Sequence, residues 1–253
     1  MSGRNAALLL TCVSAACVAV GSGKASHAGA SATAVTPLKV VPARTPPFRV
    51  PRYDTKGTYP QLRPRALDLR AVNAVLRSAI VADQRRYAPE ARREHAHLPS
   101  TDRGLYRTAI DRRYVSASTG VVSALLPVTE EAFRGQHNGD GWLGMTVLVP
   151  SGRRVAITDL FAKPNQGIRV LAAAWKARIR QTDARTCLHI YAADYAPTAA
   201  NYRSFALTPA GIAVGSWEVE ACYRLVATVP YSTLRPYLSQ LGAAVVAAVR
   251  QPH

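Results

Sequence analysis

The stretch from 201 to 238 constrains the fold of this chain more than any other part. Its pattern predicts three short β-strands followed by a helix from about Ser232; the strands cover residues 202–207, 212–220 and 223–229. β-branched and aromatic side chains are frequent in each strand, and Pro209, Gly211 and Cys222 mark the corners between them. A sheet closed by a helix is the expected result.

Residues 1–30 have the order of a secretory signal peptide. Arg4 lies in a polar start, an apolar run covers residues 6–20, and small residues end in Ala28-Gly29-Ala30. The apolar run is too short to cross a bilayer comfortably, and no later stretch is longer. We expect a protein that is secreted or held at the extracellular surface of the envelope, without a transmembrane span in the mature chain. A lipid anchor at Cys17 is the disfavoured alternative, because Ser14 is not apolar.

Residues 31–64 contain seven prolines and no sustained periodicity. So many prolines remove backbone donors and favour an extended chain, which predicts a disordered Pro-rich linker over 31–64. Residues 65–251 then form the folded domain, which is long enough to bury a core.

Helical periodicity appears at three places in this domain. Residues 66–88 have an apolar stripe with Asp68 as a cap and Pro89 as a stop, residues 167–180 are amphipathic, and the last helix places Leu234, Leu238, Leu241, Val245 and Val249 on one face. Strands are expected within 106–126, with a corner near Gly120, and in a hairpin over 146–157. These elements predict a single α+β domain with a mixed or antiparallel sheet packed by two or three helices.

Two cysteines, Cys187 and Cys222, remain after removal of the signal peptide. In an oxidising compartment an even pair most simply forms one disulfide. A catalytic thiol is the alternative, but the nearest histidine in sequence, His189, makes no convincing partner. His95 and His97 lie in a charged stretch expected to be a loop, where they lack a visible third metal ligand, so no metal site and no cofactor are predicted.

The formal net charge of +17 favours anionic partners. Outside the cell these are an extracellular protein or an anionic envelope component, and export argues against nucleic acid. The abundance of arginine and alanine is equally typical of compositional drift in a GC-rich genome.

The segment 133–144 contains the candidate binding residues His137, Asn138, Asp140 and Trp142. Its Asn-Gly and Asp-Gly dipeptides are typical of turns. The segment also satisfies G-x-G-x-x-G literally, but it precedes a strand, whereas a dinucleotide loop follows one. No catalytic residue is assigned.

Three runs together resemble the RsiV-type domain, a domain of largely unknown function in exported bacterial proteins: residues 201–238, residues 153–161 with Asp159-Leu160-Phe161, and Gly135-Gln136-His137-Asn138. The resemblance covers residues 59–241, and the matching positions are Phe205, Gly211, Ile212, Pro230, Tyr231 and Leu234.

The resemblance implies an α+β module that senses a ligand or binds a protein. In this family the extracellular part of the RsiV anti-sigma factor binds lysozyme, and relatives accompany peptidoglycan deacetylase domains. This chain lacks a deacetylase motif and is similar to the stand-alone secreted mycobacterial immunogenic proteins of the family. It departs from the family's Gly-Gly-Ala-His run at 135–138, and its positive charge would oppose binding of basic lysozyme.

The sequence is compatible with three functions. An exported, non-catalytic binding module is favoured because no complete catalytic constellation is visible. An envelope hydrolase acting on glycan or ester would use His137 with Asp140, or Glu218 with Glu220, which a strand would place about 7 Å apart on one face. A basic surface protein that binds polyanions is suggested by charge alone.

Overall fold

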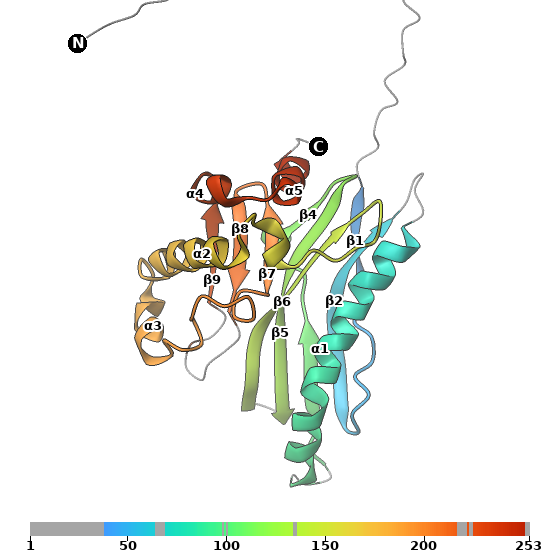
Figure 1. The fold of residues 1–253 in the computed structure, drawn as a ribbon. Coiled ribbons are helices and arrows are strands. Elements are labelled where there is room, and N and C mark those ends of the chain that lie inside the picture. Colours follow the sequence, from blue (N-terminus) through green and yellow to red (C-terminus); the bar gives the residue numbers. More distant parts are fainter. Residues whose placement is uncertain are drawn as a thin grey trace, which may run out of the picture. The chain divides into compact units, whose positions relative to one another are not determined.

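A six-stranded sheet and a three-stranded sheet form the centre of the computed structural model (Figure 1). The structure describes residues 38–63, 69–97, 99, 101–133, 136–216, 222 and 225–250, with only the backbone for residues 132, 133 and 136–140. The large sheet contains β1 (Lys39–Arg44), β2 (Tyr53–Arg63), β3 (Gly104–Thr108), β4 (Val115–Ala117), β5 (Val121–Phe133) and β6 (Gln136–Leu148). Its order is β1-β2-β3-β5-β4, and β6 pairs with the other side of β5. The β2–β3 pair is parallel and the others are antiparallel.

The small sheet is the one predicted at the C-terminal end of the chain. It consists of three antiparallel strands, β7 (Phe205–Thr208), β8 (Gly211–Gly215) and β9 (Val226–Pro230). The α-helices are α1 (Arg70–Ala96), α2 (Pro164–Ile179), α3 (Cys187–Ile190), α4 (Tyr231–Leu234) and α5 (Gln240–Arg250). Short 3-10 turns occur at η1 (Arg112–Tyr114), η2 (Ile157–Leu160), η3 (Asp183–Thr186) and η4 (Arg235–Tyr237). The predicted single α+β domain is confirmed.

The elements pack in four layers, α1, the large sheet, the small sheet and α2. Leu76 and Ile80 of α1 share a core with Leu126 and Met145 of the large sheet. The opposite face of the large sheet packs on the small sheet. There the small side chains of Ala206 and Ala213 lie against Leu125 and Trp142 of the large sheet. The far face of the small sheet packs on α2, where the indole of Trp175 donates a 3.0 Å hydrogen bond to the carbonyl of Val214.

Serine hydroxyls join the two sheets. The backbone N–H of Leu207 in β7 donates to Oγ of Ser123 at 2.7 Å, and its carbonyl accepts from Ser116 at 2.6 Å. Ser204 donates to the carbonyl of Trp142 in β6 at 2.6 Å. Buried backbone groups need such partners, so these hydroxyls fix how the sheets meet.

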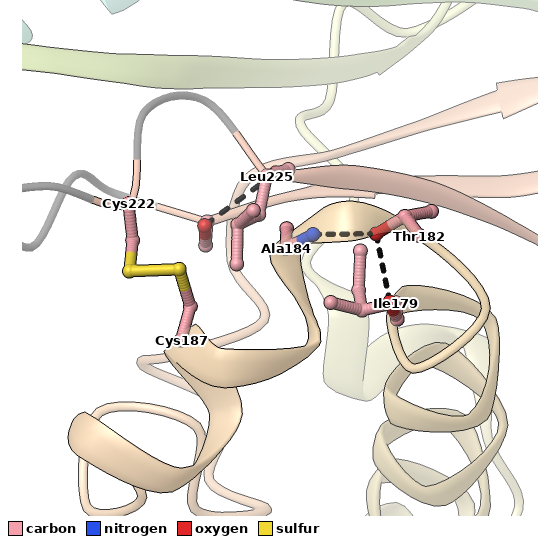
Figure 2. The surroundings of a disulfide bond; sticks show 7 residues. Ile179, Thr182, Ala184, Cys187, Cys222 and Leu225 are labelled. Carbon is pink, nitrogen blue, oxygen red and sulfur yellow. Dashed lines mark hydrogen bonds between the residues drawn. A yellow bond between two sulfur atoms is a disulfide. The ribbon is translucent and has the colours of Figure 1, made fainter.

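The predicted disulfide is present. Cys187 begins α3 and is bonded to Cys222, with the two Cα atoms 5.8 Å apart (Figure 2). Nearby, the hydroxyl of Thr182 donates to the carbonyl of Ile179 at 2.7 Å and accepts from the N–H of Ala184 at 3.3 Å. These contacts hold the turn between α2 and η3.

Two predictions about proline are wrong. Residues 39–44 and 53–63 form β1 and β2 rather than a disordered linker, and Pro42 lies opposite Pro60 in their register. β1 is the last strand of the sheet, where a missing donor is tolerated. Helix α1 also continues through Pro89 to Ala96. Pro89 is exposed, so water can hydrogen-bond the carbonyl that its ring leaves without a partner.

Other boundaries differ because of tertiary contacts. His95, expected in a solvated loop, belongs to α1 and is 4% exposed, with its ring 4.6 Å from that of Tyr53. The Asn138-Gly139 and Asp140-Gly141 pairs lie within β6 rather than in turns, because β6 pairs with β5 along its length. The single last helix is interrupted at Leu238, which forms a bridge with Phe161.

Residues 1–37, 64–68, 98, 100, 134–135, 217–221, 223–224 and 251–253 lie outside the described part of the chain. The predicted signal peptide, Cys17, the Asp68 cap and the pair Glu218 and Glu220 therefore remain predictions. Among the described residues, no helix has the length and apolarity to cross a membrane.

Candidate functional site

A polar cavity of about 210 Å³ lies where α1, β6, the end of β8 and the segment 194–204 meet. Its lining combines positive, negative and aromatic side chains, of which the most informative are Arg86, Arg154, Arg203, Asp83, Asp194, Trp142 and Tyr195. The chain segments that supply them are far apart in sequence, so only the packing of the layers creates the site.

Asp83 is the buried acid of this site. It lies on the apolar face of α1 and is only 6% exposed. Its carboxylate accepts a 2.8 Å hydrogen bond from the hydroxyl of Tyr106 and forms a 2.8 Å ion pair with Arg86. A buried carboxylate is stable only when it is paired and hydrogen-bonded, and both conditions are met here.

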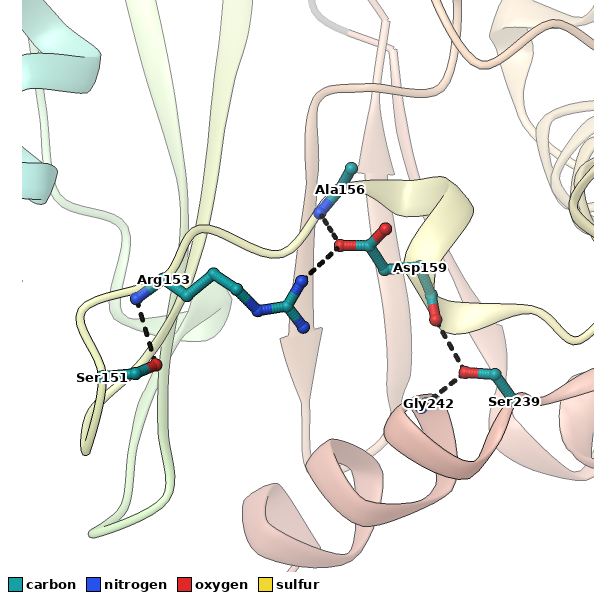
Figure 3. A network of polar contacts seen from close by, with 6 residues as sticks. All are labelled: Ser151, Arg153, Ala156, Asp159, Ser239 and Gly242. Atoms are coloured by element: carbon teal, nitrogen blue, oxygen red, sulfur yellow. Dashed lines mark hydrogen bonds and ion pairs between the residues drawn. The ribbon is translucent and has the colours of Figure 1, made fainter.

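Arg154 reaches the cavity from the segment that follows β6. Its guanidinium donates a 3.0 Å hydrogen bond to the carbonyl of Gly144. The preceding residue, Arg153, instead lies 3.5 Å from the carboxylate of Asp159, which also accepts from the N–H of Ala156 at 3.1 Å (Figure 3). In an extended segment neighbouring side chains point to opposite sides, so this pairing leaves Arg154 for the cavity.

The turn that contains Asp159 is itself anchored. Its carbonyl accepts a 2.6 Å hydrogen bond from the hydroxyl of Ser239, and that hydroxyl accepts from the N–H of Gly242 at the start of α5 (Figure 3). The Asp-Leu-Phe run noted in the sequence therefore links the segment carrying Arg154 to the last helix.

Arg203 adds a third positive charge to the cavity. Among the described residues it forms no ion pair. Burial lowers the pKa of its guanidinium, the positive charge of Arg86 lowers this pKa further, and the negative charge of Asp83 opposes the shift. Two guanidinium groups thus repel each other beside one cavity, which is a favourable environment for an anion.

Aromatic rings form the wall of the cavity. Trp142 and Tyr195 are 6% and 3% exposed. Trp142 packs edge-on against Tyr114 at 5.5 Å between ring centroids, and Tyr195 lies 5.5 Å from Trp175. The indole N–H of Trp142 is buried and has no hydrogen-bond partner among the described residues. The wall therefore combines buried aromatic rings with a polar N–H group.

Glu130 is a second buried acid, close to Asp83 but outside the cavity lining. Burial raises the pKa of its carboxyl to about 9, and the charge of Asp83 contributes to this rise. Its Oε1 has no hydrogen-bond partner among the described residues. At neutral pH Glu130 is thus a neutral acid beneath α1.

Of the four predicted binding residues, Trp142 lines the cavity. His137, Asn138 and Asp140 belong to β6, but their side chains lie outside the described part of the structure. Sequence reasoning missed the cavity arginines, because 27 arginines along the chain hide the three that converge. Asp83 was the one sequence feature that pointed to this site, since an acid on an apolar helix face requires a polar or charged partner.

Comparison with models of protein families and with curated proteins found no match. Among solved structures, the fold is similar to that of a DUF3298 family protein from Pseudomonas aeruginosa PAO1, with a TM-score of 0.50 and 11% identity over 81% of this chain and 95% of that chain. A DUF3298 family member from Bacteroides fragilis NCTC 9343 has a TM-score of 0.46 and 12% identity over 86% of this chain and 98% of that chain. The described part of this chain thus has the fold of the Pseudomonas DUF3298 protein.

Proposed function

We propose that this protein is an exported, non-catalytic binding module of the cell envelope or extracellular space, and that its cavity holds an anionic group of the ligand. The observation that carries this proposal is the pair Arg86 and Arg203 beside one cavity, where Arg203 forms no ion pair among the described residues. A carboxylate or phosphate would accept hydrogen bonds from such guanidinium groups and relieve their repulsion.

Binding is a better explanation of this site than catalysis. None of the described residues that line the cavity is a histidine or a cysteine. The hydroxyls of its two serines, Ser204 and Ser216, donate to the carbonyls of Trp142 and Leu225 at 2.6 and 3.4 Å. A nucleophile needs an adjacent base, and these hydroxyls are directed to backbone carbonyls instead.

Export is supported by the order of residues 1–30, which is that of a signal peptide. The resemblance to the RsiV-type domain supports a module that binds rather than reacts. The aromatic wall and the amide of Asn201 extend the ligand class to a small polar molecule, such as an acidic sugar, whose ring could lie against the wall.

The test is calorimetric titration of the purified protein with galacturonate and with glucose 6-phosphate, using galactose and glucose as neutral controls. We expect at least one anionic sugar to bind, and Arg203→Gln to weaken binding at least about tenfold because a hydrogen bond to a charged group is lost. Arg178→Gln is the matched control, since Arg178 is an exposed arginine on α2. Absence of binding by both anions, or equal binding by both variants, would refute the proposal.

A further inference from the structure

A second site lies on the other flank of α1. A groove of about 460 Å³ runs between this helix and the segment that joins β1 to β2. Its helical lining includes Arg77, Val81, Arg85 and Arg92, which are spaced so that they share one side of the helix. At 100° per residue this side faces away from Arg86, so the groove and the cavity are separate.

Four arginines line this groove, Arg49 from the segment after β1 and Arg77, Arg85 and Arg92 from α1. All four are exposed, and none forms an ion pair or hydrogen bond among the described residues. In the part of the chain that the structure describes, no aspartate or glutamate lines the groove. The positive charge along it is therefore not neutralised by the described part of the chain.

The three helical arginines form a row. At 1.5 Å per residue, Arg77 and Arg85 are about 12 Å apart along the axis and Arg85 and Arg92 about 10 Å. The row is thus about 22 Å long, which is far more than one phosphate or carboxylate requires. Its length and regular spacing suit a chain of charges rather than a single ion.

The floor of the groove is held in place by core packing and a hydrogen bond. Phe48 is 6% exposed and lies 5.1 Å from the ring of Tyr53 and 5.4 Å from that of Tyr106. The buried amide of Gln84 donates a 2.8 Å hydrogen bond to the carbonyl of Pro46 and so holds the opposite wall against α1. The arginines therefore stand around a rigid channel.

We infer that this groove binds a linear, phosphate-bearing polymer. Guanidinium groups match phosphate oxygens with paired hydrogen bonds, and successive phosphates of an extended chain can meet the arginines in turn. The ring of Phe48 is buried, so the floor offers no exposed aromatic platform on which nucleic acid bases could stack. The concave channel fits a single chain better than the flat surface of a membrane.

The experiment measures fluorescence anisotropy of labelled inorganic polyphosphate with the purified protein at several salt concentrations. The test variant carries Arg→Gln at positions 49, 77, 85 and 92. The matched variant carries Lys163→Gln, Arg169→Gln, Arg178→Gln and Arg180→Gln, which remove the same charge from exposed positions on and beside α2. Circular dichroism checks that both variants fold. If the fourfold groove variant does not fold, the double variant Arg85→Gln with Arg92→Gln replaces it.

We expect the groove variant to bind polyphosphate at least about tenfold more weakly and to reduce the slope of log affinity against log salt by about 3, whereas the matched variant changes little. Arg203→Gln should leave polyphosphate binding unchanged, which separates this inference from the cavity. Equal losses of polyphosphate affinity in the two fourfold variants would overturn the inference of a groove site, because net charge alone would then explain the binding. Equally tight binding of polyglutamate would overturn the phosphate assignment, and binding to phosphatidylglycerol vesicles without polyphosphate binding would assign the groove to a membrane surface.

Discussion

The hydroxyl of Tyr106 donates a 2.8 Å hydrogen bond to the carboxylate of Asp83. Tyr106 comes from β3 and is completely buried, whereas Asp83 comes from α1 and also pairs with Arg86. The contact therefore connects the centre of the large sheet to the rim of the cavity. It couples stability of the core to the position of Arg86, an arginine that lines the cavity.

Tyr106→Phe tests this connection. The substitution leaves a buried carboxylate oxygen without a partner, so the free energy of unfolding should fall by about 1–3 kcal/mol. Urea denaturation measures the change. Tyr237→Phe is the control, because the half-buried Tyr237 hydroxyl makes no hydrogen bond among the described residues and its loss should change stability by less. Equal stability of both variants would contradict the proposed role of the hydroxyl.

Glu130 should make stability depend on pH. Burial and the charge of Asp83 raise the pKa of its carboxyl from 4.5 to about 9 in the folded protein. Between these values the unfolded chain releases the proton that the folded protein keeps, so the free energy of unfolding falls as pH rises, by at most about 1.4 kcal/mol per pH unit. Above the folded pKa no further loss from this group is expected.

Glu130→Gln should remove that dependence. The variant should be more stable than the parent at about pH 8 and similar to it at about pH 4, as urea denaturation at both values would show. Glu131→Gln is the control, because Glu131 is only partly buried and lies 3.8 Å from Arg107. An unchanged pH profile in the Glu130→Gln variant would show that Glu130 is ionised in the fold.

The disulfide should contribute substantially to stability. Cys187 and Cys222 are 35 residues apart, and closing a loop of this length restricts the unfolded chain by about 3–4 kcal/mol. Cys187→Ser with Cys222→Ser should lower the free energy of unfolding by this amount, and dithiothreitol should lower it only in the parent. If dithiothreitol left the urea unfolding transition of the parent protein unchanged, the result would argue against a stabilising disulfide.

Gly144→Ala should disturb the junction of the two sheets. A Cβ atom at this position would lie 2.2 Å from the backbone nitrogen of Phe205 in β7, and a backbone atom cannot move aside without shifting its strand. We expect a loss of about 1–3 kcal/mol or more in the free energy of unfolding. Gly120→Ala is the control, because its Cβ would lie 3.2 Å from the side chain of Ala248 and 3.9 Å from that of Ser118, with no backbone atom among its nearest neighbours. Equal melting temperatures for the two variants would argue against close sheet packing.

Local sequence patterns were sufficient where neighbouring residues determine the structure. The presence and order of the three C-terminal strands, helix α2 and the Cys187–Cys222 bond were predicted correctly, although β8 (Gly211–Gly215) covers only the first part of the predicted strand 212–220. Alternating side chains and turn residues specify such strands within a few residues of each other. The prolines misled the prediction, because β1 and β2 are stabilised by pairing with each other and by β3 rather than by their own composition.

The candidate site was harder to predict, because its parts meet only in three dimensions. Asp83 and Arg203 are 120 residues apart, and no spacing rule connects them. Trp142 was found because it stood in a segment of unusual composition. Three of the groove arginines do share one helix, but Arg70 and Arg86 on the same helix have other contacts, and only the packing around α1 separates the two groups.

The serine contacts at Leu207 have a further consequence for behaviour at high concentration. β7 is the outermost strand of its sheet, and outermost strands offer free backbone groups on which another chain can assemble. Here the donor and acceptor of Leu207 are both occupied by serine hydroxyls of the same molecule. A second copy of the chain could extend the sheet at Leu207 only after displacing these hydroxyls. The edge strand β7 is therefore protected at this position against self-association and fibril growth.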